Sequence, residues 1–471
     1  MLFPSIVFLF CFFPVMLGIY FVGCNLFVPS KYRITAKNIT LLIGSVIFYA
    51  YGEGKLVLLL LLSILLNWLF ALLIDRNLYH NKALAKLFLI ADLLVNIGIF
   101  FIFKYLDFFI TNINRAIKTN LTTTGLTIPL GISFFTFQAL SYVIDVYKRK
   151  IPVQKNPLKL GLYISLFPQL IAGPIVRYET IEHEINERKE SLPDFSDGVW
   201  RFVIGLSKKV LLADALVIIY NRAILSMSAG TLLISQAWLG AFCYTLHIYF
   251  DFSGYSDMAI GLGKMFGFHF NENFNYPYIS GSITQFWRRW HISLSSWFRD
   301  YVYIPLGGSR CSAFRYIINV FVVWTLTGLW HGAAWNFVLW GMLQFVMLLI
   351  EKYIIKPESR KVIVASLYRI ITLIVILLSW TLFGAASVSD AAMYIKCMFG
   401  MTGAGFGLSL AASVISNNIV VLILGTICAT PLLRKVSKNG LVQTVLTPLL
   451  FLICIIYIIR GGFSPFIYFN F

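Results

Sequence analysis

Long apolar runs follow one another along almost the whole chain, with short polar segments between them. Runs of this length predict membrane-spanning helices, because a helix needs about 20 apolar residues to cross a hydrocarbon core of about 30 Å. They lie near residues 3–28, 38–51, 56–74, 87–103, 126–147, 160–172, 199–225, 232–250, 316–330, 334–350, 363–383, 418–433 and 441–459. We therefore expect an all-α polytopic membrane protein with roughly 11–13 membrane helices, and with re-entrant or interfacial helices where a run is too short to span.

Basic residues gather in the segments between these runs, which predicts that the segments face the cytoplasm. Most successive clusters are separated by two runs, so all of them can lie on one side. This arrangement places the N-terminus and residues 461–471 outside, with an ambiguous span count over residues 160–300. The first run lacks a basic start and is too long for a signal peptide, so we expect it to remain as the first span. The clusters are Lys31, Arg33 and Lys37; Arg76, Lys82 and Lys86; Lys148, Arg149, Lys150, Lys155 and Lys159; Arg310 and Arg315; Lys352, Lys356, Arg360 and Lys361; and Arg434, Lys435 and Lys438.

Two stretches are too polar for lipid-facing helices. Residues 177–198 form one strongly charged loop, and residues 251–310 mix Trp, Tyr, Asp, Asn, His and Arg. Side chains of this kind at membrane depth must line a wet cavity or lie at the membrane surface. No linker, low-complexity tract or fixed repeat divides the chain. We therefore expect a single transmembrane domain over residues 1–471, with a functional core near residues 245–345.

Composition agrees with this pattern, since 59% of the residues are hydrophobic and 12% are charged, whereas a soluble domain carries about 25% charged residues. The net charge of +18 would suggest nucleic-acid binding in a soluble protein. Here the excess lies between apolar runs, so we expect a lipid bilayer and no nucleic acid as partner. The seven cysteines include no C-x-x-C pair and lie mostly inside apolar runs, which predicts neither disulfides nor a zinc site.

Histidine is scarce, with six residues in the chain, and its imidazole suits acyl transfer. With an ordinary pKa of about 6.5 it can take a proton from a hydroxyl and return one to a thiolate near neutral pH. The six histidines show no H-x-x-H, H-x-x-x-H or HExxH spacing, so we expect no metal site. The G-x-S-x-G elbow and the Gly-rich nucleotide motifs are also absent from the sequence.

His331 follows the apolar run 316–330 and precedes the next span. A helix over this run rises only about 22 Å at about 1.5 Å per residue, so it would leave His331 short of the outer surface. An ionisable group at that depth is a candidate functional residue. The alternative is a structural histidine at a helix bend that Gly328 and Gly332 favour.

His291 lies in the segment FWRRWHISLSSWFRD. If this segment is one helix, His291, Ser295 and Phe298 share a face of an amphipathic element. The alternative to a catalytic role is a helix that lies on the membrane surface. The interfacial anchors of that helix are expected to be Trp287, Trp290 and Trp297. The segment also offers candidate acyl-carrying nucleophiles, among which spacing does not select: Ser293, Ser295 and Ser296.

Four segments closely resemble the membrane-bound O-acyltransferase family. They are LIAGPIVRYE (170–179), YFDFSGYSDMAIGLGKMFGF (249–268), NFNYPYISGSITQFWRRWHISLSSWFRDYVYIPLGGSR (273–310) and LTGLWHGAAWNFVLWG (326–341). They look most like the bacterial branch that acetylates alginate and peptidoglycan, which the chain ending SPFIYFNF also resembles.

This resemblance implies a ring of helices around a funnel that opens to the outside and has a thin floor. The histidine of the family's W-H-G motif falls on His331, and the second family histidine falls on His291. The resemblance also implies that acetyl groups cross a bacterial plasma membrane. They pass to an extracytoplasmic SGNH-type partner protein or directly to a polysaccharide.

On this basis we hypothesise that acetyl-CoA is the cytoplasmic acyl donor and that no cofactor is permanently bound. His331 acts as general base toward an acceptor hydroxyl or transiently carries the acetyl group. His291 orients the donor or stabilises charge. The further residues expected to line the cavity, each of which could equally be structural, are Asp257, Trp290, Arg299, Asp300, Trp330 and Asn336.

Other functions also fit the apolar pattern. A transporter predicts internal repeats and helices broken at matched positions, and the sequence shows no such symmetry. Spacing alone also allows a structural scaffold for polysaccharide export, and loss of acetylation with intact export on mutation of His331 would distinguish the enzyme from it. Within the family, the D-alanyl transferases of teichoic acid synthesis share the RWH and RDY elements, and several glycans, cellulose among them, are possible acceptors.

Overall fold

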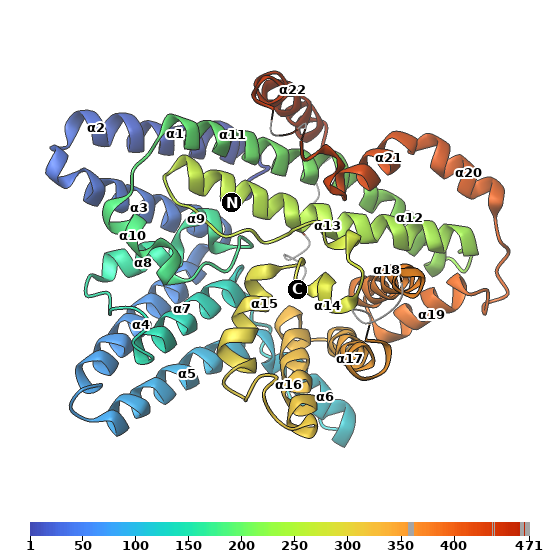
Figure 1. Ribbon diagram of the computed structural model, residues 1–471, viewed down its shortest axis with the longest axis horizontal. Helices are drawn as coiled ribbons and strands as arrows, with labels where there is room; N and C mark the ends of the chain where they lie inside the picture. The colour runs from blue at the N-terminus through green and yellow to red at the C-terminus, as the bar shows by residue number, and fades with distance from the viewer. Residues whose placement is uncertain (357–361, 436, 438, 462–465, 467–471) are drawn as a thin grey trace. The chain divides into compact units, whose positions relative to one another are not determined.

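The computed structural model describes residues 1–356, 362–435, 437, 439–461 and 466. Helices account for 77% of the described residues, which contain no strand, and this confirms the all-α prediction. The chain divides into two compact units, and Figure 1 labels their helices. Unit 1 comprises Met1–Phe202 and Ser256–Asn271, and unit 2 comprises Val203–Tyr255 and Glu272–Phe471. Two of the three boundaries fall within helices α11 (Leu192–Ser207) and α13 (Ile234–Met265), and the third falls in the non-helical stretch after α13.

Unit 1 is built from helices of very unequal length. The longest of them are α3, α4 and α5, which are apolar enough to cross a bilayer. The helices are α1 (Phe13–Leu17), α2 (Cys24–Phe27), α3 (Arg33–Glu53), α4 (Val57–Asn77), α5 (Lys82–Lys104), α6 (Leu106–Ile117), α7 (Ile132–Tyr147), α8 (Pro157–Ser165), α9 (Phe167–Leu170) and α10 (Tyr178–Glu187).

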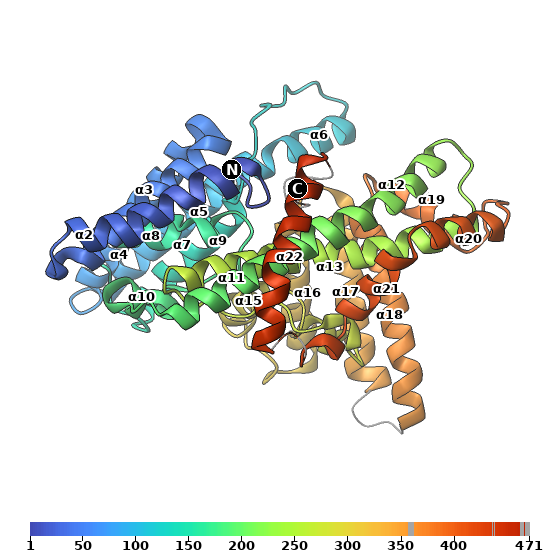
Figure 2. The same cartoon turned by 90° about the horizontal axis from the view of Figure 1, so that it is seen from above.

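Polar contacts inside unit 1 hold its helices in register. Helices α4 and α5 lie side by side (Figures 1 and 2), and the buried amides of Asn67 and Asn96 exchange hydrogen bonds of 3.1 and 3.2 Å across them. The predicted polar loop 177–198 is largely helical, since it contains α10 and the first turns of α11. Its Arg188 is buried and donates to the Tyr20 hydroxyl at 2.7 Å and to the side-chain oxygen Oδ1 of Asn38 at 2.6 Å. The segment is therefore anchored in the interior of the unit.

Unit 2 holds the remaining helices. The chain re-enters this unit at Glu272 through a mostly non-helical stretch, which leads to two very short helices, α14 and α15. The helices are α12 (Asp214–Ser228), α14 (Ile283–Trp287), α15 (Ile292–Phe298), α16 (Ala313–His331), α17 (Trp335–Ile350), α18 (Val362–Gly384), α19 (Val388–Met398), α20 (Leu408–Asn417), α21 (Ile419–Cys428) and α22 (Gly440–Ile459).

Helices α16 and α17 form a tightly packed hairpin in unit 2 (Figures 1 and 2). Two glycines permit the close approach of the backbones. A Cβ atom on Gly328 would lie 2.5 Å from the Phe337 carbonyl oxygen, and one on Gly341 would clash with the Trp324 carbonyl oxygen. Small residues at helix interfaces allow such contacts in membrane proteins. The hairpin matters for the site because α16 ends at His331.

Seven segments of the described residues are long and apolar enough to cross a membrane, or eight if the bent pair α20 and α21 counts as one span. One of the seven, 30–77, comprises two helices, α3 and α4. The multi-span prediction is confirmed, but the expected number of roughly 11–13 is higher. The runs at 126–147 and 160–172 yield the shorter helices α7 and α8, whose side chains are mostly buried inside the protein. Those runs are apolar because protein surrounds them.

Two predictions fall partly outside the described residues. The extracytoplasmic placement of the C-terminal end falls on residues 461–471, of which only Gly461 and Phe466 lie among the described residues. The basic residues Arg360, Lys361 and Lys438 also lie outside the described residues. The cytoplasmic placement of the basic clusters stays a prediction.

Candidate functional site

His331 is the last residue of α16, which begins three residues before the predicted apolar run 316–330. Ser312 caps the helix, because its hydroxyl oxygen accepts a hydrogen bond from the Arg315 backbone N–H at 3.3 Å. From Ala313 to His331 the helix rises about 28 Å, not the predicted 22 Å. The helix length by itself therefore no longer argues that His331 lies deep in the bilayer, and its depth stays a prediction.

Aromatic rings surround the His331 side chain, which is 5% exposed. The ring centroids of Trp330, Trp340 and Phe383 lie 5.0, 5.1 and 5.1 Å from its centroid, all nearly perpendicular to the imidazole. This edge-to-face packing is the favourable arrangement for aromatic rings. It places an ionisable group in surroundings from which water is largely excluded.

Asn336, a predicted lining residue, supports this aromatic wall from the start of α17. Its side-chain amide donates to the backbone carbonyl oxygens of Phe383 at 3.4 Å, at the end of α18, and of Ala385 at 3.0 Å, just after it. Because Phe383 packs on His331, this contact fixes one wall of the imidazole's environment. Its amide N–H groups are directed at backbone, and we assign Asn336 a positioning role.

His291 does not lie within a continuous helix, so that prediction is wrong. The segment breaks into α14 and α15, and His291 stands between them in a left-handed backbone conformation with φ of +44°. It is 2% exposed. The alternative of a surface-lying helix does not fit either, because two of its interfacial anchors, Trp290 and Trp297, are buried. The helix breaks because another segment of the same chain, which contains Asn273, forms hydrogen bonds with residues 291–293.

Asn273 provides those hydrogen bonds. Its backbone carbonyl accepts from the Ile292 N–H at 2.9 Å, and its side-chain oxygen accepts from the Ser293 N–H at 3.2 Å. A backbone N–H can only donate, so the Asn273 atom that faces it must be the oxygen Oδ1. The same oxygen lies 3.2 Å from Nδ1 of His291. Nδ1 therefore carries the proton, and Nε2 is the ring nitrogen with the lone pair.

The tautomer also bears on the candidate nucleophiles. Of the three serines, Ser293 is the one that contacts the imidazole, with its Oγ 3.4 Å from Nδ1 of His291 and 2.9 Å from Oδ1 of Asn273. Protonated Nδ1 cannot accept a proton from that hydroxyl. Ser295 and Ser296 donate to the backbone carbonyl oxygens of Trp287 and Ser293. The geometry therefore gives no support to a serine nucleophile in this segment.

Burial lowers the pKa of His291 to about 3, because the charged form loses its hydration. The imidazole is then neutral at physiological pH. The Phe252 ring on α13, which packs edge-on with its centroid 4.6 Å from that of His291, adds to this apolar environment. A neutral imidazole can orient a substrate through Nε2 without holding a proton.

Trp330 connects the two histidines. Its ring centroid lies 5.8 Å from that of His291 and 5.0 Å from that of His331. A second aromatic path runs from Trp290, through Trp380 at 4.7 Å, to Trp340 at 5.9 Å, which packs on His331. The structure thus brings together four of the predicted site residues: His291, His331, Trp290 and Trp330.

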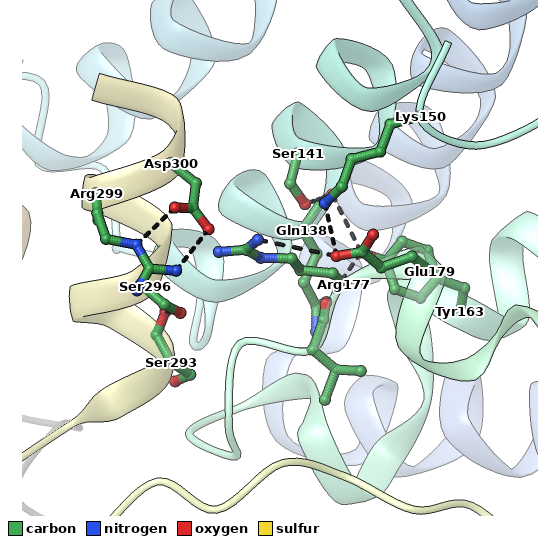
Figure 3. Close-up of polar contacts among 11 residues, drawn as sticks. Gln138, Ser141, Lys150, Tyr163, Arg177, Glu179, Ser293, Ser296, Arg299 and Asp300 are labelled. Atoms are coloured by element: carbon green, nitrogen blue, oxygen red, sulfur yellow. Dashed lines mark hydrogen bonds and ion pairs between the residues drawn. The ribbon is translucent and has the colours of Figure 1, made fainter. Parts of the chain in front are cut away.

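Three of the predicted lining residues are engaged elsewhere. Arg299 and Asp300 follow α15 and pair with each other, with Nε to Oδ1 at 2.7 Å and Nη2 to Oδ2 at 3.1 Å (Figure 3). Asp257 belongs to unit 1, where the Arg201 guanidinium donates to its Oδ1 at 2.8 and 3.1 Å. Figure 3 also shows another ion pair of unit 1, between Lys150 and Glu179 at 2.7 Å.

Sequence reasoning missed several residues of this region. Asn273 lies in the polar stretch FNENFNYP, whose density of asparagine in a membrane protein was the available signal. It also missed a buried charge cluster in unit 2, where Lys209 Nζ lies 2.6 Å from Asp214 and 2.7 Å from Asp251. These three side chains are at most 3% exposed. Lys209 is separated along the sequence from Asp251, so spacing gave no sign of the cluster.

The described residues contain no group of three or more His, Cys, Asp and Glu side chains that could hold a metal ion. What the region offers is two imidazoles in a largely aromatic enclosure. Such an enclosure excludes water and so protects a reactive ester from hydrolysis. A neutral imidazole can serve as general base for acyl transfer to a hydroxyl.

Comparison with known proteins places this region in context. The membrane-bound O-acyltransferase family matches residues 151–389. A probable alginate O-acetylase of Pseudomonas aeruginosa is 40% identical over 85% of this chain and 75% of its own length. The peptidoglycan O-acetyltransferase of Helicobacter pylori is 33% identical over 100% of this chain and 98% of its own. The teichoic acid D-alanyltransferase of Bacillus subtilis is 29% identical over 46% and 58%. The residues that match the family include both His291 and His331.

Proposed function

This chain belongs to the membrane-bound O-acyltransferase family, and we propose that it moves an acetyl group from cytoplasmic acetyl-CoA to an extracytoplasmic polysaccharide. As a family member it is an O-acyltransferase embedded in a membrane. The apolar pattern alone also allowed a transporter or a structural scaffold, but neither of these functions explains why the chain belongs to an acyltransferase family. The acetyl donor, the direction of transfer and the acceptor are the proposed parts.

The observation that carries the proposal is the pair of buried imidazoles whose rings both contact Trp330. In a chain with only six histidines, two are enclosed together by aromatic side chains. Acyl transfer to a hydroxyl needs a proton acceptor in a place that water does not reach. His331 is the proposed proton acceptor, and His291 lies in the same aromatic surroundings.

In the proposed reaction His331 is the catalytic base. It takes the proton of the acceptor hydroxyl as the hydroxyl oxygen attacks the thioester carbonyl. A C–O bond forms, the C–S bond breaks, and the proton passes to the departing thiolate to give the thiol of coenzyme A. In the two-step alternative the imidazole carries the acetyl group before the hydroxyl attacks.

His291 has a different role in this proposal. With a pKa lowered to about 3, its imidazole is too weak a base to hold the hydroxyl proton near neutral pH. Its Nε2 lone pair suits it to accept a hydrogen bond and so to orient the donor or the acceptor. His331 and His291 therefore divide proton transfer and orientation between them.

The similar proteins support a glycan as the acceptor. The two named O-acetyl-transferring relatives match most of this chain and act, by their names, on alginate and on peptidoglycan. We infer a polysaccharide outside a bacterial plasma membrane, reached directly or through an extracytoplasmic SGNH-type partner protein. A second candidate is D-alanyl transfer to teichoic acid, which the similarity to the Bacillus subtilis enzyme supports over a smaller part of the chain.

Inside-out membrane vesicles from the native cell test this proposal, because the cytoplasmic face is then accessible and any partner is retained. Vesicles with the chain, and vesicles from a strain that lacks it, receive acetyl-CoA labelled in the acetyl group. We expect alkali-labile label on glycan, or on a protein that relays it, only when the chain is present. Equal labelling in both vesicle types contradicts the proposal, and labelling from a D-alanyl thioester donor instead identifies the second candidate.

A further inference from the structure

Glu351 is a buried carboxylate whose position near the site the proposed reaction does not explain. It begins the segment η8 (Glu351–Ile355) directly after α17, and it is 3% exposed. Burial of a carboxylate is costly unless hydrogen bonds replace its hydration. The partners of Glu351 therefore indicate what the residue does.

Four donors surround this carboxylate. Oε2 accepts hydrogen bonds from the backbone N–H of Thr284 at 2.8 Å and from its hydroxyl at 2.5 Å. Oε1 accepts from the Tyr368 hydroxyl at 2.8 Å and from the Ile283 backbone N–H. All of these donors are uncharged, so the carboxylate acts here as a multiple hydrogen-bond acceptor.

Two of these donors are the first backbone N–H groups of α14. The N–H groups at the start of a helix have no partner within the helix, and negative groups stabilise them. The next N–H, on Gln285, donates to the Ser282 hydroxyl at 3.1 Å. A five-residue helix such as α14 is not stable in isolation. Its placement therefore depends on contacts of this kind.

Helix α17 and η8 hold α14 at both of its ends. Gln344 lies two helical turns before Glu351, and its side-chain oxygen accepts from Nε1 of Trp287 at 3.1 Å. Trp287 is the last residue of α14, whereas Glu351 binds the first two. Both the position and the direction of α14 are thus set from one neighbouring element.

The placement of α14 continues into the active site. The backbone N–H groups of Arg289 and Trp290 both donate to the Phe286 carbonyl oxygen at 2.9 Å, which extends the turn to the residue before His291. Asn273 holds His291 from the other side. The position of His291 is therefore set by the turn after α14 on one side and by Asn273 on the other.

We propose that Glu351 is a positioning residue for the acyl-transfer site, which acts by holding the start of α14 and through it the turn that presents Trp290 and His291. The inference rests on the proposed function, because it assigns Glu351 to the same reaction. A carboxylate is needed because it offers only acceptors. In Glu351→Gln, the new side-chain NH2 would face donors that it cannot accept from.

Residue-specific chemical modification tests this role in the full-length protein. Diethyl pyrocarbonate modifies neutral imidazoles, and mass spectrometry gives a rate for each histidine. In Glu351→Gln we expect His291 to be modified faster than in wild type, while the rate at His331, enclosed by its own aromatic rings, is unchanged. The matched control is Glu187→Gln, an exposed glutamate that pairs with His183 on the surface of α10.

Acyl-transfer kinetics provide the second readout. A displaced catalytic geometry costs about a hundredfold in rate, so we expect kcat of Glu351→Gln to fall by about that factor with little change in KM for the donor. If Glu351→Gln does not insert, Thr284→Ala removes one donor and should show a smaller change with the same signature. An equal increase in the modification rates of His291 and His331, or an unchanged kcat, would overturn the proposal. Because the modification assay needs no activity, it remains decisive if wild type fails to transfer acetyl groups.

Discussion

The backbone of His291 has a conformation that residues other than glycine rarely adopt. Its φ of +44° lies in the left-handed region, which costs roughly 1–2 kcal/mol for residues other than glycine. The hydrogen bonds that Asn273 accepts from Ile292, Ser293 and His291 offset this cost. The same contacts decide which imidazole nitrogen carries the proton.

Replacement of Asn273 therefore tests how the imidazole is oriented. Asn273→Leu keeps the shape of the side chain but removes the acceptor for Nδ1 of His291 and for the Ser293 N–H. We expect acyl transfer to fall by about a hundredfold because the ring loses its fixed orientation. Asn273→Asp retains an acceptor oxygen and should keep more of the rate. The kinetics of the two variants, at matched amounts of inserted protein, decide this point, and full activity in Asn273→Leu would refute the assigned tautomer role.

The lowered pKa of His291 predicts a pH dependence of stability. Between about pH 3 and pH 6.5 the unfolded chain binds a proton at this residue that the folded chain does not. The free energy of unfolding therefore falls as the pH is lowered through this range, by at most about 1.4 kcal/mol per pH unit for one proton.

His291→Gln removes this contribution because glutamine does not titrate. The Tm of purified wild type and of the variant is measured from about pH 8 to about pH 4.5, on either side of the ordinary histidine pKa. We expect any Tm advantage of wild type at high pH to shrink as the pH falls below about 6.5. A Tm difference that stays constant over this range would show that His291 is not held neutral by burial.

At the scale of elements, the α16–α17 hairpin positions His331 through the close contact at its two glycines. Gly341→Ala adds one methyl group that meets the Trp324 carbonyl oxygen and lies 3.4 Å from Cα of Gly328. Overpacking of this kind typically costs about 1–3 kcal/mol. We expect a lower Tm and reduced acyl transfer, since α16 must shift. Gly98→Ala in α5 is the matched control because its added methyl meets nothing within 4 Å; equal effects of the two would contradict this account.

The buried charge cluster links the segment η5 (Lys208–Ala213) to α12 and α13. Lys209→Met leaves Asp214 and Asp251 buried without their shared cation. Removal of one partner from a buried ion pair costs about 3–5 kcal/mol. We expect a large loss of Tm in Lys209→Met and substantial recovery when both aspartates are also replaced by asparagine. Stability measurements on the two variants check this, and a single variant as stable as wild type would show that the cluster does not hold these helices.

At the scale of the whole molecule, the apolar pattern predicted the fold class well. Helices such as α4 are apolar on every side, which is the signature of a lipid environment. The expected span number exceeds the number of candidate spans among the described residues, because helices like α7 are equally apolar for a different reason, burial in protein. Hydropathy alone does not separate these two environments.

The candidate site was predictable in part. His331 and His291 stood out because ionisable residues are rare in apolar sequence and because they lie in family motifs. Asn273 and Glu351 did not, since they act through hydrogen bonds to backbone groups distant along the chain. The break at His291 was missed for the same reason. Local helical periodicity does not reveal that another segment will supply hydrogen bonds and stabilise a left-handed turn.

The central claim is that the imidazole of His331 performs acyl transfer, and its substitution tests this most directly. His331→Ala and His183→Ala, the latter an exposed histidine of unit 1, are expressed to equal levels in the membrane of a strain lacking the chain. The measured quantity is the ester-linked acetyl content of the cell-surface glycan. We predict that His183→Ala restores the wild-type content and that His331→Ala gives only the background of the deletion strain. Wild-type acetyl content with His331→Ala would contradict the account.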